Sequence, residues 1–319
     1  MKGYFDIPYI KLKFSTKILS DTRMPRSKVP ALRGGMGEML LRQNCISDRN
    51  CQDCRFKESC VVMHTFYSYM PNKPSYVTGK ESVGYLIECG DIKESFPEGS
   101  DFVFFLLLFG ESIVFFNLFL QAMTQLGMEG IGKWKARFWI QEIKNTDGIP
   151  IVCGQNVDMR NYQIKNLTDY VIGRKQELGT GRKRYEMRFL TPLSMKYQKN
   201  YMKEFYSEAL VKGAARRIQM LNYYLGQEDL IPDFYEYPEI QSQEVKYAAV
   251  KRYSSTQDTS MTFYGITGRI VFDRMSETCL EYLLAGELTH MGKNISFGFG
   301  QYMLLKDHLQ EGEDEENGR

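Results

Sequence analysis

The sequence predicts an α+β protein built from two successive units, each with the element order β-α-β-β-α-β. Two observations support this prediction. Segments with the two-residue period of a strand and segments with the longer period of a helix follow one another in the same order in residues 7–144 and 184–305. A glycine-rich stretch precedes the last expected strand in each half. With 319 residues, the chain is long enough for two ordinary domains.

The first half contains four expected strands and two expected helices. Residues 7–15 alternate between apolar and polar side chains, as a strand does. Pro30 opens residues 30–43, whose apolar side chains recur at helical spacing. The other expected elements are strands at 83–89 and 102–109, a helix at 111–126 and a strand at 134–144. This order is that of a ferredoxin-like unit.

An apolar stretch, residues 101–120, approaches the length of a membrane-spanning helix. Gly110, Glu111 and Ser112 interrupt it halfway, with the chemistry of a turn and a helix start. We therefore expect a buried strand followed by a core-facing helix, and no interaction with a membrane.

The second half repeats the element order of the first. Its expected strands are residues 184–190, 245–253, 261–273 and 299–305, and its expected helices are residues 200–225 and 276–285. This pattern predicts a second ferredoxin-like unit.

The two glycine-rich stretches are residues 127–138, GMEGIGKWKARF, and residues 286–302, GELTHMGKNISFGFGQY. Their equivalent positions indicate an internal duplication. Glycine allows positive φ angles and close approach of another backbone, and a concave run of free N–H groups binds anions. The second stretch also contains His290, Lys293 and Ser296. We expect it to bind a ligand that carries phosphate groups, and its length favours a polymer.

These patterns divide the chain into four parts. We expect an N-terminal ferredoxin-like domain at residues 1–150 and a C-terminal one at residues 184–306. Residues 151–183 are an expected linker or basic loop, and the acidic residues 307–319 are an expected disordered tail.

The formal net charge of +2 conceals a more basic folded part. Residues 311–319 hold five acidic residues and one basic residue, so the rest of the chain carries about +6. Arg182, Lys183 and Arg184 lie beside glycines at the end of the expected linker, which suits a loop that contacts a phosphate backbone. A solvated linker and ordinary surface charge are the alternatives.

Four of the seven cysteines, Cys45, Cys51, Cys54 and Cys60, lie within sixteen residues. Their spacing favours a closed tetrahedral zinc site, a cysteine knuckle at residues 45–64 inserted after the first helix. An iron–sulfur cluster and a metal-free knuckle are the alternatives. The N-terminus lacks the apolar segment of a signal peptide, and the cysteine count does not indicate a disulfide scaffold, so we expect a cytoplasmic protein.

Three patches resemble the RAMP superfamily of CRISPR-associated proteins, in particular its repeat-processing endoribonucleases. These patches are residues 31–66, which include the cysteines, residues 263–272, FYGITGRIVF, and residues 286–302. The resemblance implies tandem ferredoxin-like units and cleavage of precursor CRISPR RNA without a catalytic metal. It also implies attack by the RNA 2′-hydroxyl, giving a 2′,3′-cyclic phosphate and a 5′-hydroxyl.

Such chemistry needs a base, an acid and positive charge near the phosphorane. Many members of the family carry a catalytic histidine near the first helix, but this chain has none between residues 20 and 43. His290 is our first candidate for acid–base catalysis, with a bracing or RNA-binding role as its alternative. A histidine-free site of Lys28, Arg33 and tyrosines is the competing prediction.

The resemblance implies that the glycine-rich loops and the basic run contact RNA. The expected RNA-binding residues are Gly292, Lys293, Asn294, Ser296, Gly298, Gly300, Lys133, Lys135, Arg182, Lys183 and Arg184. The expected partners are CRISPR repeat RNA and other CRISPR effector subunits, and the chain is expected to be a monomer or a homodimer. The alternative function is a non-catalytic RAMP subunit that binds CRISPR RNA within an interference complex.

Overall fold

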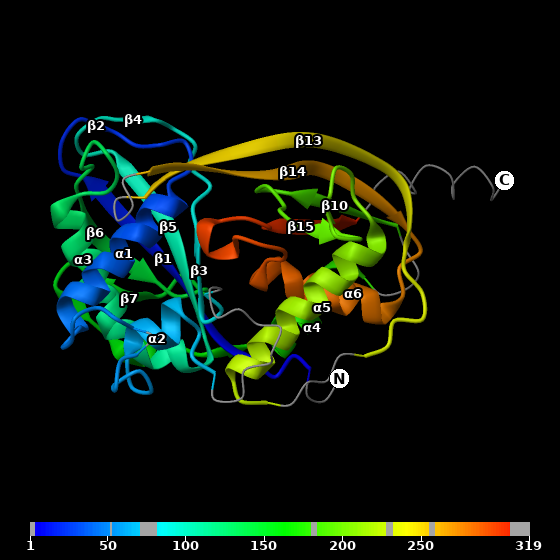
Figure 1. Cartoon of the computed structure of the whole chain (residues 1–319), viewed down its shortest axis with the longest axis horizontal. Helices are drawn as coiled ribbons and strands as arrows, with labels where there is room; N and C mark the ends of the chain where they lie inside the picture. Colours follow the sequence, from blue (N-terminus) through cyan, green and yellow to red (C-terminus); the bar gives the residue numbers. More distant parts are fainter. Residues whose placement is uncertain are drawn as a thin grey trace.

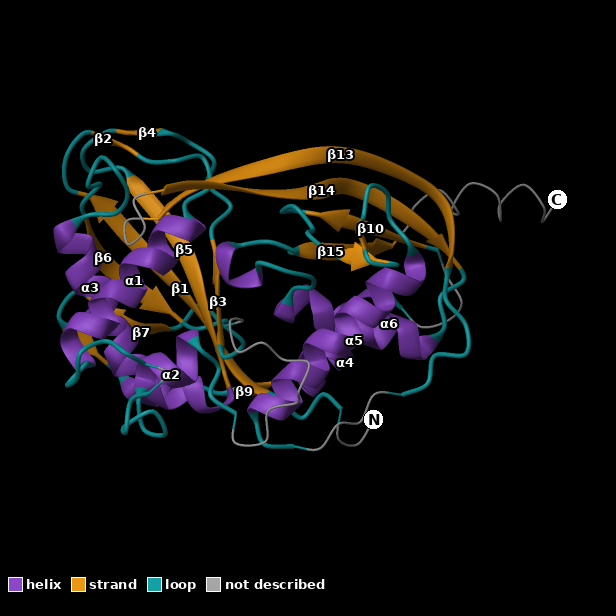
Figure 2. Ribbon diagram, viewed as in Figure 1, coloured by secondary structure: helices purple, strands orange, loops and turns teal. Residues whose placement is uncertain are grey.

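The structure, a computed structural model, describes residues 4–51, 53–70, 82–179, 184–227, 232–254 and 259–306. Two α+β units lie side by side, and a long two-stranded hairpin of the second unit extends over the first (Figure 1). Each unit has one large antiparallel sheet with helices against it (Figure 2). The predicted tandem ferredoxin-like fold is confirmed.

The N-terminal unit follows the predicted order, and its principal strands pair in the order β3-β5-β1-β6. Its elements are β1 (Pro8–Ile18), α1 (Val29–Asn44), β3 (Tyr85–Glu88), β5 (Asp101–Phe109), α3 (Phe116–Glu129) and β6 (Phe138–Lys144). A short 3₁₀ helix, η1 (Gly110–Phe115), lies where Gly110, Glu111 and Ser112 interrupt the apolar stretch. No helix in the described part of the chain is long and apolar enough to cross a membrane.

Successive side chains of β1 point to opposite faces of the N-terminal sheet, so this strand contributes to two different surfaces. Leu12 and Phe14 point into the core beneath α1 and α3, where they pack with Met36 and Phe119. The opposite face carries Lys11, Lys13 and Lys17, none of which is buried. The helix-covered face is therefore apolar, and the other face is basic.

The C-terminal unit has the same topology, with its strands in the order β13-β14-β10-β15. Its elements are β10 (Tyr185–Phe189), α5 (Ser207–Tyr224), β13 (Glu239–Ser254), β14 (Thr259–Asp273), α6 (Glu277–Thr289) and β15 (Tyr302–Lys306). The strands β13 and β14 are longer than predicted, and they form the hairpin that arches toward α1 (Figure 1).

Several smaller elements connect these frameworks. They are β2 (Thr22–Arg23), α2 (Val61–Phe66), β4 (Ser95–Phe96), β11 (Lys196–Tyr197), β12 (Asn200–Tyr201) and the 3₁₀ helix η3 (Ile295–Phe297). The predicted helix at 200–225 starts only at Ser207, because Asn200 and Tyr201 pair with Tyr197 and Lys196 in a short hairpin.

The expected linker, residues 151–183, contains more regular structure than the sequence indicated. It carries β7 (Pro150–Cys153), β8 (Asn156–Val157), η2 (Met159–Asn161), β9 (Lys165–Asn166) and α4 (Leu167–Leu178). The strands extend the N-terminal sheet, and α4 packs on α6 of the other unit. Residues 180–183 and the predicted tail, 307–319, lie outside the described residues.

The two units share one hydrophobic core in addition to the core of the N-terminal unit. Leu107 and Phe109 of β5 belong to the same buried cluster as Leu210 of α5 and Leu283 of α6. Arg217 of α5 crosses this boundary as well, donating hydrogen bonds to the carbonyl oxygens of Thr289 and Val83 at 3.0 and 3.1 Å. Burial of this apolar surface fixes the orientation of the units.

Candidate functional site

The loop between α6 and β15, residues 290–301, is the glycine-rich stretch that the sequence analysis identified. Its backbone has positive φ at His290, Gly292, Asn294, Gly298 and Gly300. A Cβ atom at Gly300 would overlap the carbonyl oxygen of Met291, so only glycine fits this turn. The loop is consequently a tight, specifically shaped connection.

Most backbone N–H groups of this loop already donate hydrogen bonds within the protein, so most of the loop does not form the expected anion-binding site. Lys293 N donates to Ser194 O at 2.7 Å, and Gly300 N donates to Pro192 O at 2.9 Å. Further loop N–H groups donate to acceptors in the protein, namely those of Met291, Phe297, Gly298, Phe299 and Gln301. The bonds from Lys293, Gly300 and Gln301 hold the loop against the segment that follows β10, and the others close turns within the loop. Together they leave the side chains of the loop as the main recognition groups.

Arg33 joins the first helix of the N-terminal unit to this loop. Its Nε donates to Ser296 Oγ at 3.2 Å, and its guanidinium carbon lies 4.3 Å from the centroid of the Phe297 ring. A terminal nitrogen also donates to Ser82 Oγ at 3.4 Å. The half-buried guanidinium therefore lies at the junction of the two units.

Tyrosines lie beside this guanidinium. Tyr67 is 38% exposed, and burial together with the charge of Cys51 raises the pKa of its hydroxyl, while Arg33 opposes that shift. Tyr85 is completely buried, which raises its pKa, again against the effect of Arg33. The junction thus combines a cation with an accessible phenol. The sequence analysis expected tyrosines with Arg33, but it did not identify Tyr67, which lies in no recognisable motif.

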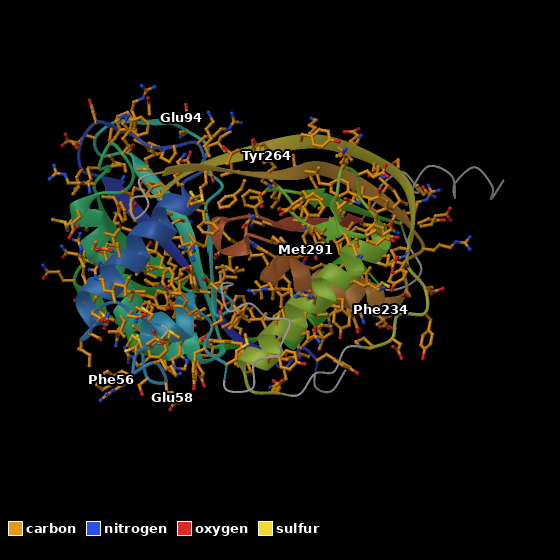
Figure 3. The ribbon with its side chains drawn as sticks, viewed as in Figure 1. Phe56, Glu58, Glu94, Phe234, Tyr264 and Met291 are labelled. Carbon is orange, nitrogen blue, oxygen red and sulfur yellow. The ribbon has the colours of Figure 1, made fainter. Side chains whose placement is uncertain are left out.

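Aromatic packing closes the other side of the loop. Phe263 of β14 lies 5.3 Å from Phe297 and 6.1 Å from Phe299, measured between ring centroids. The hairpin residue Tyr264 and the loop residue Met291 show how the hairpin passes above the loop (Figure 3). Phe299 is 1% exposed, so packing rather than base stacking accounts for this residue.

His290 lies in the boundary between the units. Its side chain is 1% exposed, and its Nε2 lies 3.1 Å from Oε1 of Glu88 on β3. Lys11 Nζ lies 2.6 Å from the second carboxylate oxygen. Burial opposes ionisation of Glu88, but the bond to His290 and the Lys11 charge lower its pKa to about 2. This placement favours the bracing role of His290 over the acid–base role.

Lys28, the other predicted catalytic residue, is also buried, with a side-chain exposure of 0%. Its Nζ donates to the carbonyl oxygen of Lys93 and lies 3.9 Å from Asp91 Oδ1. Burial lowers the pKa of this amine, although Asp91 opposes the effect. Lys28 holds the 91–96 segment against the start of α1, and it does not present a charge to solvent.

His64, the other histidine in the part of the chain that the structure describes, does not supply an open acid–base group either. His64 is 8% exposed, with its Nδ1 2.9 Å from Glu111 Oε2 and its Nε2 2.7 Å from the carbonyl oxygen of Glu58. His308 lies outside the described residues.

A basic pocket of about 410 Å³ lies next to the loop, between α5 and the β11–β12 hairpin. Its basic lining residues are Lys196, Lys212, Arg216, Arg217 and Lys293. The rest of the lining includes Met195, Tyr197, Met220 and Ile295. Tyr201 marks the rim, with Lys196 Nζ at 5.1 Å and Lys293 Nζ at 5.8 Å from its ring centroid. Such a pocket suits a phosphate together with a flat apolar group.

The remaining predicted RNA contacts lie in other places. Lys133 and Lys135 are exposed on the connection between α3 and β6. Arg184 lies 3.7 Å from Asp273 at the start of β10. Arg182 and Lys183 lie outside the described residues.

The four cysteines of the predicted knuckle lie in the segment between α1 and α2. Cys45 caps the end of α1 and Cys60 the start of α2. Burial raises the pKa of Cys51, and the other three thiols add to the shift. Within the described residues, however, no group of three or more His, Cys, Asp or Glu side chains is arranged to hold a metal ion. The zinc site therefore stays a prediction from spacing.

Two family models match successive parts of the chain. Residues 7–166 match the N-terminal domain of the AF_1859 type, and residues 187–302 match the CRISPR-associated endoribonuclease Cas6. A search of curated protein sequences finds no match.

Solved structures share the fold at low sequence identity. A partial Cas6-RT-Cas1–Cas2 complex matches with 12% identity and a TM-score of 0.58, covering 95% of this chain and 47% of that chain. A Cas6 product complex matches with 12% identity and a TM-score of 0.51, covering 93% and 100%. A second Cas6 product complex gives 13% identity, the same TM-score, and coverages of 94% and 100%.

The chain spans about half the length of the first of these relatives, 47%, and 29% of another Cas6-RT-Cas1–Cas2 chain. The structural matches establish the tandem fold, and the two family models account for one unit each. Residues 187–302 are thus similar in sequence to the CRISPR-associated endoribonuclease Cas6, and the chain shares the fold of solved Cas6 structures, in line with the resemblance that the three sequence patches carry.

Proposed function

We propose that the protein binds CRISPR repeat RNA and cleaves precursor CRISPR RNA as a metal-independent endoribonuclease. The observation that carries the proposal is the junction in which Arg33 of α1 reaches Ser296 and Phe297 of the glycine-rich loop. A half-buried guanidinium held by both units is suited to phosphate, because its planar donors match phosphate oxygens. The match of residues 187–302 to the Cas6 endoribonuclease supports the same conclusion.

The reaction proposed at this junction is an internal phosphoryl transfer. The 2′-oxygen of the nucleotide before the cleavage point forms a bond to phosphorus, and the bond from phosphorus to the 5′-oxygen breaks. The 2′-hydroxyl loses its proton, and the leaving 5′-oxygen gains one. The products are a 2′,3′-cyclic phosphate and a 5′-hydroxyl.

Arg33 is the residue to which we assign stabilisation of the phosphorane. Tyr67 is the candidate for protonating the 5′-oxygen, since its hydroxyl interacts electrostatically with Arg33, is partly exposed, and as a phenol is protonated at neutral pH. A base for the 2′-hydroxyl is not assigned. The burial of His290 and Lys28 supports a structural role for both residues in this proposal.

The basic pocket beside the loop extends the site along the RNA. Lys293 lines this pocket, and its loop neighbour Ser296 binds Arg33, so one short segment connects pocket and junction. We propose that a nucleotide next to the cleavage point occupies the pocket, with its phosphate between Lys196 and Lys293. Other CRISPR subunits remain proposed partners, and the Cas6-RT-Cas1–Cas2 complexes support that proposal.

One observation favours the non-catalytic alternative, an RNA-binding RAMP subunit. Both histidines in the described part of the chain are buried, at 1% and 8% exposure. A site without an accessible histidine depends on arginine and tyrosine for its chemistry, and such a site could hold RNA without cutting it.

The deciding experiment incubates the purified protein with its repeat RNA in the presence of EDTA. We expect a shortened product whose 3′ end resists phosphatase until acid opens the cyclic phosphate. A repeat with a 2′-deoxy nucleotide before the cleavage point should bind and remain intact. Tight binding of the all-ribose repeat without any product would establish the alternative.

A further inference from the structure

The only two tryptophans of the chain, Trp134 and Trp139, lie on one short connection and strand. Both are exposed, at 50% and 43%. In the described part of the chain, neither indole donates a hydrogen bond or packs on another aromatic ring. Tryptophan is usually well buried in a protein of this size, so two exposed indoles with no internal partner mark a contact surface.

The loop tip that carries Trp134 is held in a fixed shape. Ile131 and Ala136 exchange two backbone hydrogen bonds, of 2.9 and 3.0 Å, across its base. Lys135 N donates to Gly132 O at 3.2 Å, and Lys135 itself has a φ of +49°. A non-glycine residue in this region is strained. The tip thus presents Trp134 between two lysines at an energetic cost.

Trp139 lies on the face of the N-terminal sheet that the helices leave uncovered. It pairs with Lys17 of β1, so both side chains share that face. Arg137, two residues earlier, is exposed on the same side. Three basic residues, Lys133, Lys135 and Arg137, and the two indoles therefore lie within seven residues, 133–139.

The acidic groups near this surface already have cationic partners. The Glu129 carboxylate interacts electrostatically with Lys135, but it accepts a hydrogen bond from Arg42 at 2.9 Å. Asp101 lies 2.9 Å from Lys17 Nζ. Among the described residues, no aspartate or glutamate therefore forms an ion pair with the basic side chains of the tip.

We propose that residues 133–139 bind an unpaired segment of RNA, with bases stacked on Trp134 and Trp139 and phosphates at Lys133, Lys135 and Arg137. Exposed aromatics interleaved with basic side chains suit single strands, because a duplex hides the faces of its bases. This proposal rests on the proposed function, and it adds the single-stranded part of the substrate to it.

The position of the tip supports a continuous RNA path. A Cβ atom on Gly132 would lie 3.8 Å from Pro25, and Val29, which contacts Gly298 of the glycine-rich loop, follows four residues later. Four residues span at most about 14 Å of extended chain. RNA held at the Arg33 junction can therefore reach the tip within a few nucleotides.

The test uses the intrinsic fluorescence of the full-length protein, since these two residues are its only tryptophans. Titration with an unstructured RNA, such as oligouridine, should quench the emission, and a fully paired RNA duplex should quench it much less. The variants Trp134→Phe and Trp139→Phe each retain one indole, so the quenching of each variant reports on that indole alone. Because phenylalanine also stacks, each variant should keep most of its affinity for labelled RNA.

Affinity measurements with alanine variants complete the test. Trp134→Ala should weaken single-strand binding about 5- to 100-fold, as loss of a stacked base predicts. Lys133→Ala with Lys135→Ala should flatten the salt dependence of log K by about 1.4. Tyr235→Ala, which removes a residue that is 96% exposed in the other unit, serves as the matched control.

The outcomes separate the two proposals. If repeat RNA is bound and cut while quenching is absent and Trp134→Ala binds normally, the tip proposal is overturned and the nuclease stands. If no RNA binds at all, both are overturned. A blue shift with anionic lipid vesicles and none with RNA would identify the surface as a membrane contact and refute RNA binding there.

Discussion

His290 Nε2 lies 3.1 Å from Glu88 Oε1, and this contact joins the glycine-rich loop of one unit to the sheet of the other. The two side chains are 1% and 6% exposed, and Lys11 completes the cluster. A charged group in such a setting is stable only while its partners are present. The cluster therefore fixes the loop in relation to the N-terminal sheet, and with it the position of Ser296 beside Arg33.

The first prediction concerns the role of His290. We expect His290→Ala to lower the free energy of unfolding by roughly 2–4 kcal/mol, since it leaves part of a buried carboxylate unpaired. The measurement is urea unfolding followed by circular dichroism. At temperatures where the variant is folded, its single-turnover cleavage rate should stay within tenfold of the wild type. A hundredfold slower rate at unchanged stability would restore His290 as the catalytic acid or base.

The second prediction is a pH dependence of stability that originates at Glu88. Its pKa is about 2 in the folded protein against 4.5 for an ordinary glutamate. A lowered folded-state pKa stabilises the fold above pH 4.5, and the contribution, about 3 kcal/mol, disappears as the pH falls from 4.5 toward 2. Urea unfolding of wild type and Glu88→Gln should differ most at neutral pH, and the difference should shrink below pH 4.5 and nearly vanish as the pH approaches 2. A difference that stays constant with pH would contradict this assignment.

The fold could be predicted because its determinants are local. Alternation in residues 7–15 and helical spacing in residues 30–43 are properties of neighbouring residues, and they reappear as β1 and α1. The segment at 151–183 contains more regular structure than its sequence indicated, because β7 has only four residues and β9 only two. Their pairing with β6 and β1 is a tertiary contact that no local pattern contains.

The candidate site was less accessible to prediction for the same reason. Arg33 and Ser296 are 263 positions apart, and only the packing of the two units brings them together. The sequence identified both residues, but as members of separate motifs. It also could not show that His290 points into the boundary between the units, because a histidine beside glycines resembles an exposed loop residue.

The third prediction tests the basic pocket. Lys293→Ala and Lys196→Ala should each weaken binding of repeat RNA, and each should reduce the slope of log K against log salt concentration by about 0.7 to 0.9. Fluorescence anisotropy at several salt concentrations measures both quantities. Lys212→Ala is the internal comparison, since Lys212 is already paired with Glu208 at 2.5 Å and should change the slope less. Equal slopes for all four proteins would place the RNA elsewhere.

The fourth prediction concerns the shape of the glycine-rich loop. Gly300→Ala combines a φ of +74° with an overlap against the Met291 carbonyl, and it should disturb the loop and slow cleavage strongly. Gly148 has a similar φ of +78° with no atom within 4 Å of an added Cβ. Gly148→Ala should therefore cost only about 1–2 kcal/mol and leave cleavage unchanged. Similar effects of the two substitutions on cleavage would show that positive φ alone, and not the close contact, matters.

The fifth prediction addresses Arg33 itself. Arg33→Ala should lower the single-turnover cleavage rate by about 10²–10³, the range found when one donor to a developing anion is removed. Arg33→Lys should recover only part of this loss, because an ammonium group cannot bond Ser296 and a phosphate in the same plane.

The matched control for Arg33 is Arg42→Ala on the same helix. Arg42 is exposed and pairs with Glu38 and Glu129, each at 2.9 Å, so its removal should leave the rate unchanged. Thermal unfolding of each variant shows whether a slow rate reflects lost folding.

Arg33 also connects α1 to the glycine-rich loop, so its role could be purely structural. In that case, Arg33→Ala should weaken RNA binding and stability together, and Arg33→Lys should behave the same way. A phosphate-stabilising role instead predicts near-normal RNA affinity with a slow chemical step. Cleavage at the wild-type rate by folded Arg33→Ala would remove this residue from the site.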